Sequence, residues 1–430
     1  MKNNGIIRFM RGNEKNIQKD CFLWNTVAGL FNAAQAVVMM MIITRTDGVE
    51  ASGILSIAFA MGNLLMTIGK FGVRNYQVTD VKKENTFNSY MTMRIITTLL
   101  MFVVSIIYIM WKRLNGNYSF TKAGIVLAIC SIYVVESFED VFLGYYQEEG
   151  RLDIGSKVFV VRWFFIMLTF AICAVAGMGL FVSVTVALMV SIVVEIVLLN
   201  CTRKLFELPK IQIETGKISI LFKNCTALFL AAFLTYYVTN APKYAIDQYL
   251  TEEIQAYFGY ISMPVFVVEL LNCFLYQPQM VMLANNWEQK EYVSFNKRVL
   301  RQIGLIIILT IICVIGAYIL GIPVLSMLYG VDLNAYKNEL IVLMVAGGAL
   351  AFVGYTSVLL TIMRKQNILL GNMVIISVAA LVGFGWIVRE QGMMGAAKYY
   401  LLLMFVLAIL NYCCTIIIEL KTKENIRKRR

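Results

Sequence analysis

The sequence predicts an all-α integral membrane protein whose twelve transmembrane helices form two six-helix lobes. Hydrophobic residues make up 59% of the 430 residues and charged residues only 15%, whereas soluble domains average about 25% charged residues. The mean hydropathy is +0.72. Twelve apolar runs, each close to the roughly 20 residues that a helix needs to cross the hydrocarbon core, take up most of the chain. They leave no stretch long enough for a soluble domain.

The first six runs predict an N-terminal lobe over residues 1–205. They lie near 21–44, 51–70, 91–110, 122–147, 157–177 and 179–199. The first run exceeds the core of a signal peptide, which has about 7–15 residues, and no small-residue cleavage site follows it. We therefore expect it to remain in the protein as a membrane span.

The other six runs predict a C-terminal lobe over residues 223–430. They lie near 223–246, 255–283, 302–320, 339–362, 368–388 and 396–420. Proline removes a backbone hydrogen bond from a helix, and Pro242, Pro264 and Pro278 interrupt the first two runs. Broken helices are typical of substrate sites and hinges in transporters, although a simple kink is the alternative. The basic segment 206–222 is the longest connection, and we expect it to be a cytoplasmic linker between the lobes.

Connections rich in lysine and arginine alternate along the chain with connections that contain few of them. With a cytoplasmic N-terminus, the cytoplasmic segments carry 30 of the 38 basic residues and the outer segments carry 8. Because cytoplasmic loops are enriched in lysine and arginine, both termini are predicted to be cytoplasmic. The net charge of +12 then follows mainly from the topology and suits an anionic inner leaflet, so no nucleic-acid partner is expected.

Several common signatures of enzyme active sites are missing from the sequence. The chain has no histidine, which excludes histidine-based metal sites and Ser/His or Cys/His catalysis. None of the nine cysteines forms a CxxC pair, and no GxxxxGK[ST] phosphate loop is present. We therefore expect no enzyme, no catalytic residue, no metal and no cofactor, with H⁺ or Na⁺ as the coupling ion.

The stretch VVESFEDVFLGYYQ, residues 134–147, places three carboxylates in an apolar run. Glu136, Glu139 and Asp140 are three or four residues apart and fall within one stripe of a helix. A carboxylate near the bilayer centre costs about 2.5–3.5 kcal/mol, so the stripe must face other helices or a wet cavity. Two interpretations stay open: a cavity wall that binds a proton or Na⁺, or salt bridges with lysine or arginine of other spans. Glu269, near the middle of the eighth span, is a further candidate for cation coupling.

Five basic or aromatic side chains near the span ends are candidate substrate ligands: Lys70, Arg74, Tyr236, Tyr237 and Lys243. Lysine and arginine can receive a phosphate group, and arginine can do so with two hydrogen bonds. The alternatives are a generic cytoplasmic charge for Lys70 and Arg74, and an ion pair with Asp247, four residues on, for Lys243. The two tyrosines can stack on sugars or belong to the core.

With these segments, the chain resembles the bacterial polysaccharide-exporting flippases. Those proteins move undecaprenyl-diphosphate-linked oligosaccharides across the plasma membrane and share a superfamily with the multidrug and toxin extrusion proteins. The resemblance covers nearly the whole chain and rests on FLWNTVAGLFNAAQAVVMMMIITR (22–45), EASGILSIAFA (50–60), FGVRNYQVTD (71–80), VVESFEDVFLGYYQ (134–147), and NAPKYAIDQYL with YFGYISMP (240–264). It implies a multidrug-and-toxin-extrusion-like fold, alternating access of a cavity between the lobes, and H⁺ or Na⁺ antiport.

The resemblance also implies roles for individual residues. Basic cavity residues of such carriers attract the diphosphate and acidic ones handle coupling, which points to Arg74, Glu136, Asp140 and Lys243. The membrane-centre charges of this sequence are nevertheless mostly acidic, so either the diphosphate stays at the headgroup level or the acids are paired.

The predicted function is a flippase for lipid-linked oligosaccharide in O-antigen, lipopolysaccharide or exopolysaccharide biosynthesis at the bacterial plasma (inner) membrane. Membrane lipids, a polysaccharide polymerase and glycosyltransferases are the expected partners. The alternative is a cation-coupled small-molecule or multidrug extruder of the same architecture, which the acidic stripe favours. A membrane-embedded polymerase or ligase is disfavoured, because the predicted outer loops are short and histidine is absent.

Overall fold

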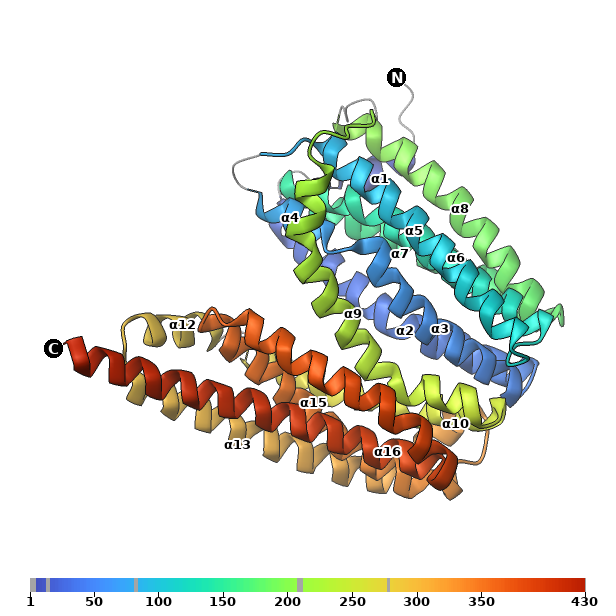
Figure 1. Ribbon diagram of the computed structural model, residues 1–430. Coiled ribbons are helices and arrows are strands. Elements are labelled where there is room, and N and C mark those ends of the chain that lie inside the picture. Colours follow the sequence, from blue (N-terminus) through green and yellow to red (C-terminus); the bar gives the residue numbers. More distant parts are fainter. Residues whose placement is uncertain (1–4, 13–15, 81–83, 207–211, 277–278, 430) are drawn as a thin grey trace. The chain divides into compact units, whose positions relative to one another are not determined.

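The computed structural model describes residues 5–12, 16–80, 84–206, 212–276 and 279–429, and those ranges contain helices and no strand (Figure 1). Two compact units divide the chain at Tyr236 and Tyr237, inside one long helix. The predicted linker at 206–222 is part of the first unit, although residues 207–211 lie outside the described ranges.

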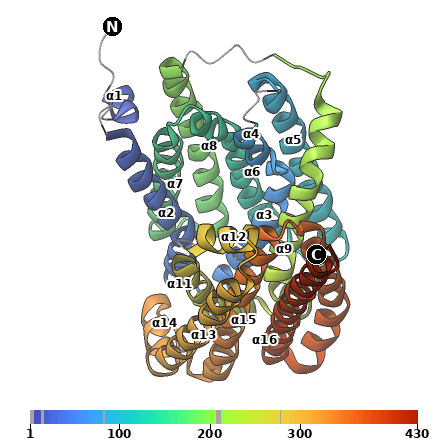
Figure 2. The same cartoon turned by 90° about the vertical axis from the view of Figure 1, so that its left-hand side faces the viewer.

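The first unit consists of helices that correspond to the first six predicted spans and the beginning of the seventh. They are α1 Gly5–Arg11, α2 Ile17–Thr46, α3 Val49–Lys70, α4 Val73–Thr79, α5 Phe87–Leu114, α6 Phe120–Glu148, α7 Leu152–Val175, α8 Gly179–Phe206 and the first part of α9 Ile218–Tyr249. Helix α6 packs against α3, α4, α5, α7 and α8, so it forms the centre of the unit (Figures 1 and 2).

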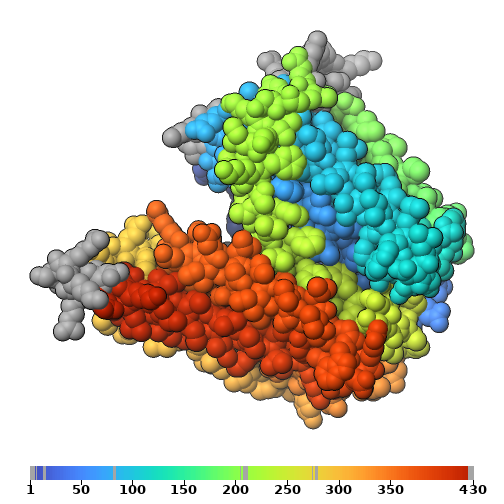
Figure 3. Space-filling view, in the orientation of Figure 1, coloured from blue at the N-terminus to red at the C-terminus, as the bar shows by residue number. Residues whose placement is uncertain are grey.

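The second unit begins within α9 and holds the remaining helices. They are α10 Glu252–Ser262, α11 Val265–Tyr276, α12 Met280–Glu288, α13 Tyr292–Gly316, the π-helical segment Ala317–Gly321, α14 Ile322–Tyr329, the 3₁₀ turn Asn334–Tyr336, α15 Lys337–Ile362 and α16 Gln366–Arg429. The orange and red atoms of α16 run along one face of this unit (Figure 3). Helix α15 packs against α16.

The predicted apolar runs fall on long helices of the described chain. Ten stretches are long and apolar enough to cross a membrane by length and composition. Helix α6, with 29 residues, has the length of a further crossing. Helix α16 has 64 residues, about 96 Å if straight, but Gly392 departs from helical geometry and divides it. The two arms lie side by side, because the Asn372 side chain donates a hydrogen bond to Asn411 at 2.9 Å.

Lipid-facing surfaces explain why several spans are apolar all round. The helices at the periphery expose large hydrophobic side chains such as Leu99, Ile107, Val193 and Ile312, each more than half exposed. A water-soluble protein would bury such side chains, whereas a bilayer solvates them. The chain is therefore a multi-pass membrane protein.

Hydrogen bonds tie the described end of the linker to the start of α5. The Glu214 carboxylate accepts hydrogen bonds from the hydroxyl groups of Thr86 and of Ser89, the latter at 2.8 Å. Thr86 is the N-cap of α5. The Lys217 ammonium donates to the Glu84 carbonyl. We call this contact of residues 212–217 with residues 84–92 the linker clasp. It fixes the described end of the linker to the first unit.

We expect the linker clasp to open in acid. The hydrogen bonds from Thr86 and Ser89 lower the pKa of Glu214, so the clasp is intact above the ordinary glutamate pKa of about 4.3. It is lost as the pH falls through the lowered value, because the protonated carboxyl no longer accepts both bonds. Hydrogen exchange of residues 212–217 should become fast on acidification. Glu214→Gln should exchange fast already at neutral pH, and equal protection in this variant would contradict the assignment.

Candidate functional site

The three carboxylates of α6 are buried in the first unit. Glu136 is 4% exposed, Glu139 is 1% exposed and Asp140 is 8% exposed. All three form ion pairs with cations of other helices, so the predicted interhelical salt bridges are present. All three also line a pocket, so the cavity wall of the other interpretation is present as well.

Asp140 lies between two arginines. Arg94 of α5, which is fully buried, approaches one carboxylate oxygen at 2.6 Å. It also donates to the carbonyl of Gly69 at the end of α3, at 2.7 Å. Arg74 of α4 approaches the other oxygen of Asp140 at 3.5 Å and donates to the Gln147 side chain at 2.9 Å. Asp140 therefore forms ion pairs with α5 and α4, and Arg94 extends this link to the end of α3.

Glu136 and Glu139 share the guanidinium of Arg162, a fully buried residue of α7. The distances from Arg162 are 2.6 Å to Glu139 and 3.4 Å to Glu136. A third carboxylate, Glu195 of α8, lies 3.6 Å from the same guanidinium. The indole N–H of Trp163 donates to Glu136 at 3.0 Å. A buried charge is tolerated only when it is paired and hydrogen-bonded, so this cluster holds α6, α7 and α8 together.

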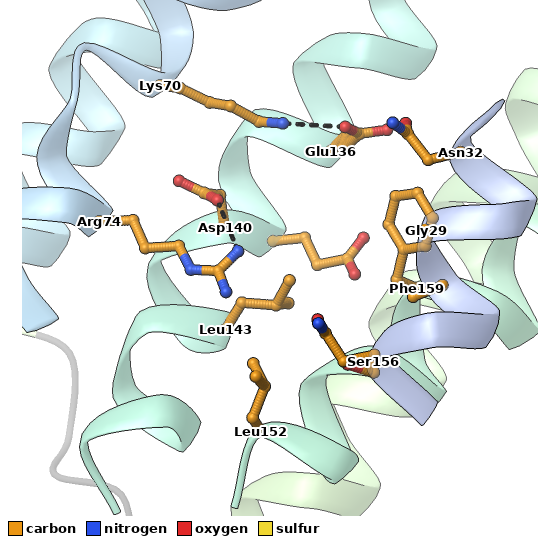
Figure 4. Close-up of a pocket in the computed structure, with 13 residues that line it drawn as sticks. Gly29, Asn32, Lys70, Arg74, Glu136, Asp140, Leu143, Leu152, Ser156 and Phe159 are labelled. Carbon is orange, nitrogen blue, oxygen red and sulfur yellow. Dashed lines mark hydrogen bonds and ion pairs between the residues drawn. The ribbon is translucent and has the colours of Figure 1, made fainter. Parts of the chain in front are cut away.

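Lys70 and Arg74 are the most accessible charges of this network. Lys70 lies 3.0 Å from Glu136 (Figure 4), and its side chain is 32% exposed. The side chain of Arg74 is 27% exposed. The two cations stand on either side of a turn in which Phe71 and Gly72 both have left-handed φ, 42° and 69°. This turn ends α3 and restarts the chain as α4, which aims both cations at the α6 carboxylates.

Gly72 makes this turn feasible, and Gly72→Ala is expected to disturb it. A Cβ at Gly72 would lie 2.7 Å from the Cβ of Leu228 on α9, in addition to the roughly 1–2 kcal/mol that a left-handed backbone costs other residues. We expect lower thermal stability and weaker transport. Gly116→Ala is the matched control, because Gly116 has a similar φ of 76° and open space around it. Equal behaviour of the two variants would show that the close approach to Leu228 is unimportant.

Two pockets meet at the accessible cations. The α2 pocket, of about 290 Å³, is lined by α2, α3, α4, α6 and α7 (Figure 4). The α9 pocket, of about 420 Å³, is lined by α3, α4, α6 and the first part of α9. Lys70, Arg74 and Asp140 line both pockets and form their shared edge. Tyr236, one of the predicted substrate ligands, lines the α9 pocket.

The remaining predicted site residues belong to the second unit. Tyr237 stacks on Tyr244, with ring centroids 6.1 Å apart. Lys243 is buried and lines a cavity of about 20 Å³, room for about one water molecule, beside Pro242. Glu269 of α11 is partly buried, and its carboxylate lies near Gly354 of α15.

Sequence reasoning missed three members of the network, Arg94, Arg162 and Glu195. Arg94 and Arg162 stand near the ends of apolar runs that the sequence predicts to be cytoplasmic, where lysine and arginine are normally topological charges. Helices α5 and α7 begin seven and ten residues earlier, at Phe87 and Leu152, which places both arginines inside the helical bundle. The available signal was the need for cations: three carboxylates in an apolar helix require positively charged partners, and Arg94 and Arg162 lie in neighbouring predicted spans.

Several solved transporter structures share this arrangement of helices. A multidrug-resistance MATE family transporter of the MOP superfamily, in an inward-facing conformation, superimposes with a TM-score of 0.71 over 91% of this chain and 96% of its own, at 13% identity. The fold is that of the MOP-superfamily transporters. The lipid II flippase MurJ, in an inward closed conformation, matches with a TM-score of 0.70 over 93% of this chain and 89% of its own, also at 13% identity.

A third structure with a similar fold has a binding pocket of unusual polarity. A transporter from Pyrococcus furiosus, reported with a binding pocket of reverse polarity that suggests a different function, has a TM-score of 0.56 at 15% identity over 98% of this chain and all of its own. No family model matches the chain, and no curated protein matches it. At such low sequence identity, the structural similarity establishes the fold alone. The cargo has to be inferred from the residues of the site.

Proposed function

We propose that this protein is an alternating-access transporter that flips an undecaprenyl-diphosphate-linked oligosaccharide across the plasma membrane. One observation carries the proposal. The charges most accessible at the two pockets are the cations Lys70 and Arg74, whereas the carboxylates beside them are buried and held by arginines. An accessible pair of cations at the shared edge of two pockets suits a diphosphate.

The half of the network around Asp140 has an excess of positive charge. Arg94 and Arg74 both contact this single carboxylate, and Arg94 alone satisfies it at 2.6 Å. The longer contact of Arg74, at 3.5 Å, leaves its guanidinium available to another anion. A phosphate group that reaches Arg74 therefore replaces a weak contact and leaves the buried pair intact.

The other half of the network has an excess of negative charge. Three carboxylates, Glu136, Glu139 and Glu195, share Arg162 and Lys70. Neither oxygen of Glu195 has a hydrogen-bond partner among the described residues, although the side chain is buried. A proton or Na⁺ between Glu139 and Glu195 would balance this charge. We assign cation coupling to this carboxylate group, with Glu195 added to the predicted residues.

Flipping assays in proteoliposomes test the proposal. Fluorescent oligosaccharide linked to undecaprenyl diphosphate is placed in the membrane, and the fraction reaching the opposite leaflet is followed with a membrane-impermeant quencher. The protein should raise the flipping rate well above that of empty liposomes, and a cation gradient should drive accumulation on one side. A rate equal to that of empty liposomes would contradict the proposal.

A multidrug extruder is the second candidate, and one observation favours it. Glu136, Glu139 and Asp140 line the α2 pocket, so a cationic drug would meet carboxylates there. Efflux of a lipophilic cationic dye from the same proteoliposomes separates the two functions. Dye efflux without flipping of the sugar lipid would favour the extruder.

The proposal also includes the remaining predicted site residues, the partners and the cellular location. Tyr236 and Tyr237 are candidate sugar-stacking residues, Lys243 is a candidate ligand for the anionic head, and Glu269 is a candidate coupling carboxylate. The protein would act in the bacterial inner membrane with both termini in the cytoplasm. A polymerase and glycosyltransferases would supply and use its cargo in cell-surface polysaccharide synthesis.

A further inference from the structure

We infer that the α2 pocket binds the sugar residue attached directly to the diphosphate, and that an amide-lined face of α2 recognises it. This inference rests on the proposed function and specifies which part of the cargo occupies which pocket. The residues that carry it are Asn25, Gly29, Asn32, Ser156 and Phe159, all of which line the α2 pocket (Figure 4).

Two asparagines of α2 face the pocket with unused hydrogen-bonding groups. Asn25, Gly29 and Asn32 follow one another at helical spacing, so they share one face of α2. Within the described chain, Asn25 makes no hydrogen bond. Asn32 uses only its carbonyl oxygen, which accepts from Gln35 at 3.3 Å. An amide offers donors and an acceptor together, as a sugar hydroxyl does, whereas a phosphate offers acceptors only.

Gly29 leaves a gap between the two amides. A Cβ placed on Gly29 would meet no atom within 4 Å, so the space in front of it is open. A glycine in a helix interior costs about 0.5–1 kcal/mol relative to alanine, and no neighbouring helix packs closely enough to require it here. The open space is thus available to a ligand that lies flat against α2.

An aromatic side chain and a hydroxyl complete the wall on α7. Phe159, 9% exposed, lines the same pocket as Gly29 (Figure 4). The flat C–H face of a pyranose ring packs well on such a ring. Ser156 makes no hydrogen bond through its hydroxyl within the described chain, although the residue is 3% exposed. Amides, an aromatic ring and a hydroxyl around one gap are a set that suits a sugar.

The size and position of the pocket fix which sugar it takes. At about 290 Å³ it is at the lower limit of small-ligand pockets, roughly 300–1,000 Å³, which is room for about one sugar ring inside the pocket. Lys70 and Arg74 form its border with the α9 pocket. A diphosphate on these cations therefore places its first sugar next to Asn32 and Gly29.

Binding to two lipids tests the inference. The full-length protein in nanodiscs is titrated with undecaprenyl diphosphate, with or without one labelled N-acetylhexosamine. Gly29→Leu should fill the gap and weaken binding of the sugar-bearing lipid at least tenfold, while binding of the sugar-free lipid stays unchanged. Asn25→Leu with Asn32→Leu should act in the same direction. Ala33→Leu is the matched control, because it places the same leucine side chain at an exposed position of α2 outside the pocket.

The outcomes separate this inference from the proposed function. Binding of both lipids by Gly29→Leu with wild-type affinity would overturn the sugar pocket and leave the flippase proposal standing. Equal loss of both lipids would also overturn it, because the pocket would then not distinguish the sugar. A wild-type protein that binds neither lipid would contradict the proposed function, and the sugar pocket with it.

Discussion

Arg162→Met is expected to lower the free energy of unfolding by about 3–5 kcal/mol, because it leaves buried carboxylates without their cation. Arg162 is fully buried and contacts Glu136, Glu139 and Glu195, from two different helices. Glu136 keeps Lys70, but Glu139 and Glu195 keep no other cation within the described chain. Thermal unfolding in detergent, followed by tryptophan fluorescence, measures the loss.

A compensated variant shows whether charge is the cause. Replacing Glu139 and Glu195 by glutamine together with Arg162→Met removes the orphaned charges and should recover most of the lost stability. It should not recover transport, because the proposed coupling carboxylates are gone. If Arg162→Met alone unfolds at the wild-type temperature, the network contributes nothing to stability and the ion-pair assignment is wrong. If the triple variant stays as unstable as the single one, lost packing and not charge is the reason.

Lys70→Ala combined with Arg74→Ala is expected to abolish transport of a diphosphate cargo while the protein stays folded. Each ionic hydrogen bond to a phosphate contributes about 1.5–3 kcal/mol, so each cation accounts for roughly 10- to 150-fold in affinity. Asp140 keeps Arg94 and Glu136 keeps Arg162, so no buried carboxylate loses its last cation. The flipping assay and the unfolding temperature are measured on the same preparation.

A matched pair of cations controls for net charge. Lys297 and Arg301 of α13 have the same four-residue spacing and are exposed. Lys297→Ala with Arg301→Ala removes the same charge from the protein surface and should leave flipping unchanged. Equal loss in both double variants would mean that transport depends on overall charge and not on the shared edge of the two pockets.

The helical architecture could be predicted from the sequence because hydrophobicity alone determines which segments cross a membrane. Some of the helix breaks also follow from local chemistry, since Pro264 separates α10 from α11 and Gly392 separates the arms of α16. The predicted break at Pro242 is wrong, because α9 continues through this proline from Ile218 to Tyr249. Pro278 lies outside the described residues. The acidic stripe of α6 was recognisable from its spacing. These features are encoded locally, within a few helical turns.

The partners of the acidic stripe could not be predicted in the same way. Arg94, Arg162 and Glu195 are separated from Asp140 and Glu139 by 23 to 56 residues, and only helix packing brings them together. Arginine at the border of a span has two physical uses, topology and ion pairing, and the sequence does not distinguish them. The three carboxylates of α6 predict that buried cations lie nearby, but the sequence does not identify which lysines or arginines they are.

Equilibrium binding of undecaprenyl diphosphate to the wild-type protein and to the Lys70→Ala, Arg74→Ala variant tests the central claim most directly. If these cations bind the diphosphate of the cargo, the wild type binds the lipid and the variant binds it at least about 100-fold more weakly. A lipophilic cation should not displace the lipid from either protein. Equal affinity of the two proteins for the lipid, or tight binding of the cation to the same pocket, would contradict the claim.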